Sequence, residues 1–436
     1  MKFYAAAAVA VVALTGPTAA QVGNPATPRV GSPAMQPAGP PAPIETLRPE
    51  PRSGPLPGVL TINQALEEAA ARSPTIVAAE AEVSAAEARI RQAGYRTNPE
   101  LSVEVENFAG TGELRGLRST ETTVAVNQRL DLGGRRSARV SAAEAELTVQ
   151  RLRLSIAKAD LSQAVREQFA RSIAAREKLA QATENEERAR ELARVAGILV
   201  EAGRDPPLRA LRARSAYAQA QAEREAAEAS ELAARSSLAA LFGASQPIGS
   251  VAGSALNVTP AEVNPEVSLD VRLADAERGA AQAGVRQQLA ERRIDPAVGV
   301  GVRHVRETGD VGLVAGISMP LRLFDRNQGN IEAARQTANA ADARRESALA
   351  TTTAKARNAV ANVEAARRRV DALENAAVPE ATEALRLAEL SYREGRASLI
   401  ELIDIQNAYT ASRSSLTEAR LELAIATAEL GRILAQ

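Results

Sequence analysis

The sequence predicts a mainly α-helical chain with a small β portion, in which one order of elements occurs twice. Aromatic residues make up only 2% of the chain, and Ala, Glu, Arg and Leu dominate its middle and end. This composition is typical of long helices packed through small side chains. Two pairs of short segments alternate apolar and polar residues, as strands with two different faces do. The turn sequence Gly203-Arg204 recurs as Gly395-Arg396, which indicates a duplication.

The charge balance and the absence of cysteine exclude several classes of function. The chain has 53 basic and 53 acidic residues, and no block of one sign stands out. We therefore expect no nucleic-acid partner. Without cysteine there are no disulfides and no thiolate metal site.

The N-terminus reads as a secretory signal peptide over residues 1–20. Lys2 precedes an apolar run over 5–14, and the small residues Thr18, Ala19 and Ala20 suit a cleavage site before Gln21. That run is too short to span a bilayer, and no later apolar segment approaches the ~20 residues required. We expect an exported protein that is either periplasmic or held in the outer membrane as a β-barrel. Residues 21–58, which contain eleven of the 22 prolines, are expected to form a linker.

The first repeat is expected over residues 59–245. Helical periodicity begins near Leu60 and reaches about Tyr95, with an interruption at Pro74. Strands are expected at about 100–108 and 120–130, because apolar and polar residues alternate there. A helix to about residue 200 follows, then a turn at Gly203 and a helix over 208–242.

A linker rich in Gly, Ser and Pro is expected over 246–265, and the second repeat over 266–436. The order of elements is the same. Strands are expected at about 297–305 and 311–319, a long helix over 327–393, a turn at Gly395 and a last helix over 399–434.

Individual residues also mark the duplication. The corresponding segments are Asn98-Pro99 and Asp295-Pro296, Leu130-Asp131-Leu132 and Leu321-Arg322-Leu323, and Tyr217 and Tyr409.

Four strands cannot close a barrel, and about eight is the practical minimum. Three copies would supply twelve strands and two copies only eight. One set of alternating residues suits lipid: Val298, Val300, Val302, Leu313, Ala315, Ile317 and Met319. The glycines between them suit a lumen. Closure of a barrel therefore requires more than one copy, and a barrel whose lumen continues into a bundle of long helices forms a tube.

Residues 60–436 resemble the TolC family of outer-membrane efflux proteins. The segments over 98–107 and 128–136, including Asn98-Pro99 and Gly133-Gly134, resemble its CzcC-like branch, which serves cobalt-zinc-cadmium efflux. The segment Tyr392-Arg393-Glu394-Gly395, followed by 399–402, is similar to the family's periplasmic turn. The resemblance implies a homotrimer with a 12-stranded outer-membrane β-barrel that is continued by a periplasmic α-helical tunnel. It implies that this assembly is an exit duct for divalent heavy-metal cations. It also implies a periplasmic adaptor and an inner-membrane RND transporter as partners.

The candidate gate consists of Glu401, Asp404, Arg209 and Arg212. Glu401 and Asp404 are three residues apart on one helix and therefore share a face. The resemblance implies that acidic residues at these positions constrict the periplasmic mouth. Arg209 and Arg212 occupy the matching first-repeat positions, which suggests salt bridges at the mouth. The family pattern has an acidic residue near Arg209 and an arginine at Ala397, so a different set of pairs is expected to close this gate.

The candidate adaptor-contact turns carry Gly203, Arg204, Gly395, Arg396 and Tyr392. They lie at the far ends of both helical hairpins, about 100 Å from the strands by helix length.

No catalytic residues, no metal site and no cofactor are expected, because the sequence has no phosphate loop, no Ser/His/Asp set and a single histidine, His304. Two alternatives stay open at this point. One is an outer-membrane duct for drugs or other small organic molecules. The other is a periplasmic coiled-coil adaptor or structural protein.

Overall fold

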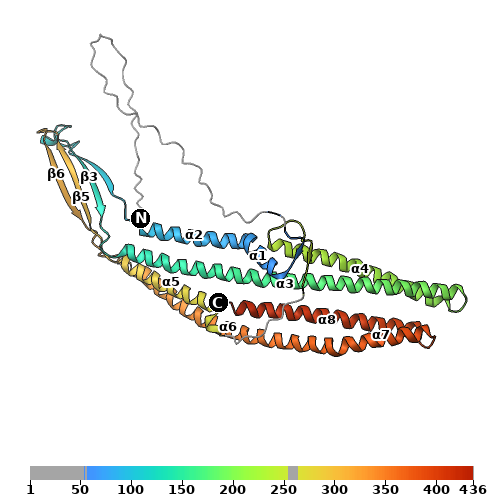
Figure 1. Ribbon diagram of the computed structural model, residues 1–436. Helices are drawn as coiled ribbons and strands as arrows, with labels where there is room; N and C mark the ends of the chain where they lie inside the picture. Colours follow the sequence, from blue (N-terminus) through green and yellow to red (C-terminus); the bar gives the residue numbers. More distant parts are fainter. Residues whose placement is uncertain (1–53, 55, 254–263, 436) are drawn as a thin grey trace, which may run out of the picture. The chain divides into compact units, whose positions relative to one another are not determined.

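Figure 1 shows the computed structural model, which describes residues 54, 56–253 and 264–435. The described residues belong to one compact unit that extends from Pro49 to Gln436. The predicted signal peptide 1–20 and all of the predicted linker before residue 54 lie outside the described residues.

The first repeat begins with two short helices. α1 (Ile62–Arg72) starts after Thr61, whose side chain accepts from the Gln64 amide while the Gln64 side chain accepts from the Thr61 amide. This capping box satisfies two amides at the start of the helix. α2 (Pro74–Gly94) starts at Pro74. Proline fits a first helical position but not a helix interior, so the interruption expected there divides the segment into two helices.

A long helical hairpin completes the first repeat. α3 (Arg135–Glu201) has 67 residues, which corresponds to about 100 Å. It turns at Gly203 into α4 (Pro207–Leu241). In Figure 1 the two helices run side by side, and α3 also packs against α2, α5 and α8.

The second repeat contains α5 (Leu269–Glu291), α6 (Gln328–Ala372), α7 (Val378–Arg393) and α8 (Leu399–Ile433). α6 and α7 are joined by the π-helical segment η3 (Leu373–Ala377), where the Val378 amide donates to the Leu373 carbonyl. Sequence reasoning expected one uninterrupted helix here. In a regular helix the Pro379 ring would collide with the carbonyl four residues earlier, and the wider turn accommodates it. Two 3₁₀ turns, η1 (Gly112–Leu114) and η2 (Pro265–Val267), lie in connecting segments.

The four strands form one antiparallel sheet in the order β2-β3-β5-β6. Their bounds are Glu100–Glu106, Glu121–Arg129, Ala297–Val305 and Val311–Ser318. β2 ends before Asn107, whose φ of 54° leaves the extended region. β3 pairs with β5, so the two hairpins form one sheet, with β2 and β6 at its edges.

The register gives the sheet two different faces. One face carries rows of apolar side chains, among them Val103, Val124, Val302 and Leu313 in adjacent positions. Leu313 is 91% exposed in the single chain. The other face carries Arg303, which forms ion pairs with Glu121 at 3.0 Å and with Glu106 at 3.2 Å. An exposed apolar patch of this kind marks a surface that other molecules cover.

The expected linker over 246–265 contains a strand. β4 (Ser250–Val251) pairs in parallel with β1 (Val59–Leu60), with Val59 opposite Ser250. Leu60 and Val251 are buried with Phe169, Leu238 and Phe242 in one apolar cluster. This pairing was not expected, because two residues are too few to show a period and the two strands are far apart in the sequence.

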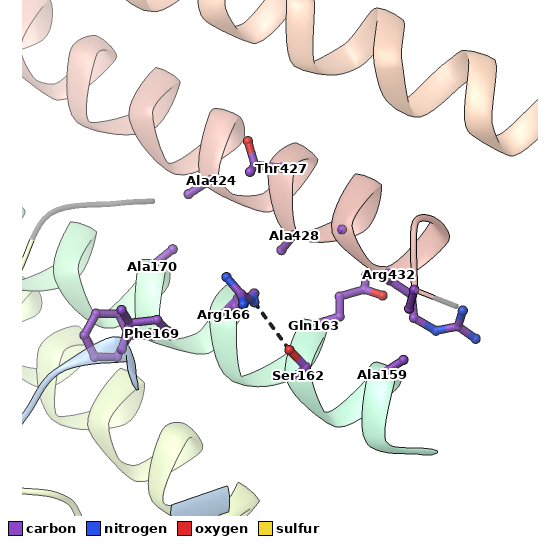
Figure 2. Close-up of a pocket in the computed structure, with 13 residues that line it drawn as sticks. Ala159, Ser162, Gln163, Arg166, Phe169, Ala170, Ala424, Thr427, Ala428 and Arg432 are labelled. Carbon is purple, nitrogen blue, oxygen red and sulfur yellow. Dashed lines mark hydrogen bonds between the residues drawn. The ribbon is translucent and has the colours of Figure 1, made fainter. Parts of the chain in front are cut away.

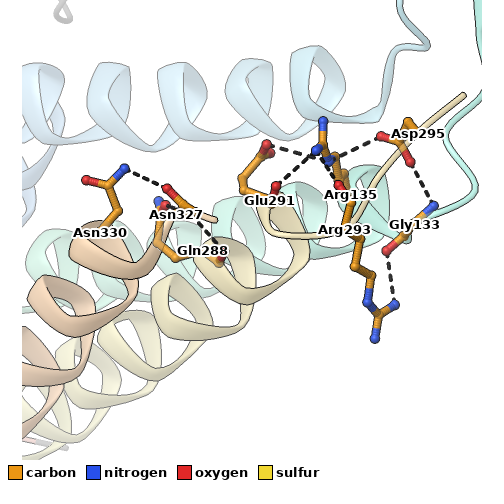
Figure 3. Close-up of polar contacts among 8 residues, drawn as sticks. All are labelled: Gly133, Arg135, Gln288, Glu291, Arg293, Asp295, Asn327 and Asn330. Carbon is orange, nitrogen blue, oxygen red and sulfur yellow. Dashed lines mark hydrogen bonds and ion pairs between the residues drawn. The ribbon is translucent and has the colours of Figure 1, made fainter. Parts of the chain in front are cut away.

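The strands and the helices meet at a polar junction that joins the two repeats (Figure 3). The Gly133 amide donates to Asp295 Oδ1 at 2.9 Å, and Arg135 Nε lies 3.2 Å from Asp295 Oδ2. Arg135 also donates to the backbone carbonyls of Glu291 and Arg293. The Asp295 side chain is only 1% exposed, so this junction buries a paired charge between the start of α3 and the start of β5.

No helix among the described residues combines the length and the apolar character that crossing a membrane requires.

Candidate functional site

The two helical turns at the ends of the hairpins have the same backbone geometry. Gly203 has a φ of 67° and Gly395 a φ of 73°. The Arg204 amide donates to the Leu199 carbonyl at 2.9 Å, and the Arg396 amide donates to the Ser391 carbonyl at 2.8 Å. Both are six-to-one bonds of a helix that ends in a left-handed glycine. The duplication therefore extends to the conformation of the turns.

The helix that follows each turn starts with its own signal. α4 begins at Pro207, which suits a first helical position. α8 begins after Ser398, whose hydroxyl accepts from the Glu401 amide at 3.2 Å. Glu401 thus lies in the first turn of α8, where a negative charge interacts favourably with the helix dipole.

An apolar cluster joins the two hairpins near these turns. We call it the tip cluster, and its buried members are Leu192, Ala196, Ala213, Leu385, Ala388, Leu399, Leu402 and Tyr409. Its members come from α3, α4, α7 and α8. Tyr392 of α7 packs against it with part of its surface exposed. The cluster holds both candidate turns in one structural unit.

The four candidate gate residues are exposed at this end of the helices. Arg209 forms an ion pair with Asp205, at 2.5 Å, and not with Glu401 or Asp404. Within the part of the chain that the structure describes, Glu401 and Asp404 have no basic partner within ion-pair distance, and Arg212 has no acidic partner. The expected pairs between Arg209, Arg212 and these two acids do not form inside one copy, and they stay a prediction for the assembled protein.

Tyr392 lies beside the first-repeat turn. Burial of the Tyr392 phenol and the negative charge of Asp205 raise the pKa of Tyr392, while Arg209 acts in the opposite direction. The Tyr392 hydroxyl oxygen is buried and has no hydrogen-bond partner among the described residues. Asp205, which was not predicted as a site residue, is thus near enough to act on the Tyr392 phenol and forms the ion pair with Arg209.

A second group of side chains next to the tip cluster, formed by two arginines, a glutamate and Tyr409, was also not predicted from the sequence. The guanidinium groups of Arg188 and Arg413 lie 5.0 and 5.5 Å from the centre of the Tyr409 ring. Glu184 forms ion pairs with both arginines. These contacts bind α3 of the first repeat to α8 of the second. In the sequence, Tyr409 was noted only as the repeat counterpart of Tyr217, which does not indicate the residues that contact it.

A cleft of 490 Å³ opens beside this group. Four carboxylates and two arginines border it together with apolar side chains. Its lining residues are Glu184, Glu187, Arg188, Glu191, Leu192, Val195, Glu389, Tyr392, Arg393, Leu402 and Gln406.

A smaller cavity of 260 Å³ lies between α3 and α8, away from the turns (Figure 2). Its lining is mainly apolar, with Phe169 at one end and Arg432 at the other. Arg166 donates to Ser162 at 3.4 Å, and Arg432 is bound by Asp160 and Asp270. No carboxylate or histidine lines this cavity, so it offers none of the side chains that hold divalent metals best.

The described residues contain no group of three or more His, Asp or Glu side chains placed to hold a metal ion. His304 lies in β5 opposite Thr122 and Val311, which places no second imidazole or carboxylate directly across from it.

A fold of this kind is found in a solved outer-membrane protein. The crystal structure of the outer membrane protein VceC of Vibrio cholerae matches with a TM-score of 0.72 and 20% identity, over 86% of this chain and 96% of that chain.

The chain belongs to the outer membrane efflux protein family, whose model matches residues 65–244 and 266–436. The family membership and the outer-membrane localisation expected from the sequence are thereby confirmed. Two relatives are similar over most of their length. The cobalt-zinc-cadmium resistance protein CzcC of Cupriavidus metallidurans is 31% identical over 80% of this chain and 84% of its own length. The nickel-cobalt-cadmium resistance protein NccC of Alcaligenes xylosoxydans xylosoxydans is 33% identical over 69% of each.

Proposed function

We propose that this protein is the outer-membrane exit duct of a tripartite efflux system for divalent heavy-metal cations. The observation that carries the proposal is the 31% identity to CzcC over 80% of the chain. The fold agrees with it, because a sheet with one apolar face continues into helical hairpins whose first long helix, α3, is about 100 Å long. A duct of this kind would supply a path for the cation and no chemistry. The energy would come from an inner-membrane RND transporter.

The proposed assembly is a homotrimer. Among the described residues, the four-stranded sheet of one copy has two open edges, and open edges are not tolerated in lipid. Three copies supply twelve strands, which is enough to close a barrel with an open lumen. The apolar face would then meet outer-membrane lipid, and the face with Arg303 and Glu106 would line the lumen.

The proposed contact with the periplasmic adaptor is made by the two turns, through Gly203, Arg204, Gly395, Arg396 and Tyr392. In support, the two turns share one backbone geometry and are joined by the tip cluster. Repeating the pair three times would give a ring of six similar docking positions.

The proposed gate lies beside them. Glu401 and Asp404 project from the first turns of α8 and carry no counter-charge within the described chain. In a threefold assembly each would form a ring of three carboxylates, which attracts cations. Arg209 and Arg212, exposed on the neighbouring hairpin, would provide the opposite charge.

Replacing both gate acids, as Glu401→Ala with Asp404→Ala, tests this assignment. We expect larger single-channel conductance in planar bilayers and weaker block by multivalent cations, because the rings and their pairs with arginine are lost. The control is the pair Glu364→Ala and Asp371→Ala on α6, which removes the same charge from exposed positions. An ordinary exposed ion pair contributes only about 0–1 kcal/mol to stability, so the control should have little effect. Conductance and block that match the control would disprove the gate and leave the duct intact.

The proposed function is tested by deleting the gene and measuring growth on cobalt, zinc, cadmium and nickel salts and on a panel of dyes and antibiotics. We expect hypersensitivity to the metals with cellular metal accumulation, and recovery when the gene is restored. Hypersensitivity to organic compounds alone would favour the drug duct. A protein recovered only in the periplasmic fraction would favour the adaptor alternative.

A further inference from the structure

A pocket of 670 Å³ opens where the end of α2 lies beside the first turns of α3, close to the sheet (Figure 1). It lies at the end of α3 opposite to the turns and the proposed gate, so it is a separate site. No carboxylate is among the described residues that line it. Its charged and neutral polar members include Arg89, Arg96, Arg139, Gln92, Thr97 and Gln287.

The three guanidinium groups have no acidic partner within ion-pair distance in the part of the chain that the structure describes. Two nearby acids are engaged elsewhere. Glu87 of α2 pairs with Arg151 at 3.1 Å, and Glu291 of α5 pairs with Arg135 at 3.7 Å. Three positive charges that border one space repel one another, and a bound anion would remove that cost.

The helix dipoles account for only part of this arrangement. Arg89 and Arg96 lie at the C-terminal end of α2, where a positive charge interacts favourably with the dipole. Arg139 lies in the second turn of α3, near its N-terminal end, where a positive charge is unfavourable and an anion is favoured. The first turn of α3 contains no acidic residue. The charge that this end of the helix favours is therefore missing from the described chain.

The walls of the pocket are fixed by contacts that do not involve the three arginines. Gln128 of β3 donates from Nε2 to the Thr97 carbonyl at 2.9 Å. α2 packs against α3 at Gly94, where an added Cβ would lie 4.0 Å from Val140 Cγ2. The start of α3 is held by Asp295 at the polar junction. The pocket is therefore formed before a ligand enters, which lowers the entropic cost of binding.

The chemistry of the lining selects the class of ligand. Guanidinium groups bind phosphate oxygens through paired, charge-assisted hydrogen bonds, and side-chain amides and a hydroxyl can donate to the remaining oxygens. The volume lies within the range of about 300–1,000 Å³ that is typical of pockets for small organic molecules. The ligand therefore carries an organic part beside its phosphate, for which the small side chains of Ala142 and Ala143 leave room.

We propose that this pocket binds a phosphate ester, with its phosphate held by Arg89, Arg96 and Arg139. The ester is either the headgroup of a membrane phospholipid or a soluble phosphate ester, because both present the same charged oxygens. The inference goes beyond the proposed duct and does not depend on its cargo. Loss of metal export would reject the proposed function and leave the binding measurements below unaffected.

The soluble source is tested by titration calorimetry of the purified full-length protein in a phosphate-free detergent. Glycerol 3-phosphate is the probe, and glycerol is its uncharged counterpart. We expect heat of binding from glycerol 3-phosphate alone, and weaker binding as the salt concentration rises, because the salt screens exposed charges.

The lipid source is tested by native mass spectrometry of the same protein from micelles that contain phosphatidylglycerol and a diacylglycerol with identical acyl chains. We expect phosphatidylglycerol to stay bound when the detergent is removed, and the diacylglycerol to be lost. Selective binding in either arm supports the pocket and identifies the source of the ester. No preference for the phosphate-bearing member in either arm would overturn the proposal.

Variants assign the binding to this pocket. The triple variant Arg89→Gln, Arg96→Gln and Arg139→Gln should bind the ester about tenfold more weakly or worse, because it loses all three charge-assisted contacts. The corresponding triple lysine variant should keep part of the affinity, since it keeps the charge but not the paired donors. Unchanged binding in the glutamine variant would overturn the proposal.

The matched control removes the same charge from α6, as Arg344→Gln, Arg357→Gln and Arg367→Gln. These arginines are exposed, form no ion pair among the described residues and are spread along the helix. The control should bind as wild type does, and an equal loss in it would show an effect of net charge alone. If the triple variant gives no folded protein, Arg139→Gln alone is measured, and wild-type affinity in that variant would count against the site.

Discussion

Replacing Gly395 by valine is expected to abolish metal export while trimers remain in the outer membrane. Gly395 has a φ of 73°, and a Cβ built there meets nothing within 4 Å. The penalty therefore comes from the backbone conformation, which costs a β-branched residue about 1–3 kcal/mol. The turn would change shape at the proposed adaptor contact, about 100 Å of helix away from the sheet, and so the strands would be unaffected.

The measurement combines growth on toxic metal with the amount of trimer in purified outer membranes. Two matched controls separate the turn from a general effect. Gly395→Asn should retain most export, because asparagine tolerates the left-handed region. Gly197→Val, in the interior of α3 with open space around it, should also export. Full resistance in Gly395→Val would remove the turn from the proposed adaptor contact.

Replacing Asp295 by alanine is expected to cause the largest loss of stability of any single change considered for this chain. It removes the Oδ1 acceptor of the Gly133 amide and leaves Arg135, 12% exposed, without its nearer carboxylate. Breaking a buried ion pair costs about 3–5 kcal/mol. The Glu291 carboxylate, 3.7 Å from Arg135 Nε, would offset part of that cost.

Thermal or urea unfolding of the purified protein measures this loss, together with the yield of folded protein in the membrane. The stability of Asp295→Asn should lie between that of wild type and that of Asp295→Ala, because asparagine keeps an acceptor for the Gly133 amide but loses the charge. Asp310→Ala, in the exposed turn between β5 and β6, should behave as wild type. An Asp295→Ala protein as stable as that control would show that the junction does not hold the repeats together.

The long helices, the strands and the two turns could be predicted from the sequence because their signals are local. The alternation of apolar and polar residues over β5 (Ala297–Val305) determines a strand within that segment. The glycines at 203 and 395 each determine the conformation of the turn in which they lie. The family membership followed from the same duplicated order of elements. The strands at Glu100–Glu106 and Glu121–Arg129 lie within two residues of the expected limits.

Other features depend on residues that are far apart in the sequence. The parallel pairing of Val59 with Ser250 has no local signal, because a two-residue strand shows no period. The partner of Arg209 was expected across the mouth, but in one copy Asp205 lies one helical turn away and binds it first. The proposed gate pairs would therefore have to form between copies, which neither a local pattern nor a single chain specifies.

The sequence by itself determined the duplicated order of helix, strand, strand, long helix and helix, the turn glycines, and the alternation that gives the sheet an apolar face. Only the tertiary structure decided that β3 lies beside β5, that Asp295 meets Gly133 and Arg135, and that Tyr409 lies between Arg188 and Arg413. The physical reason is the distance along the chain over which each kind of interaction acts. Backbone propensity and side-chain period act over a few residues, whereas the pairing of distant segments is selected by packing and charge in the folded chain.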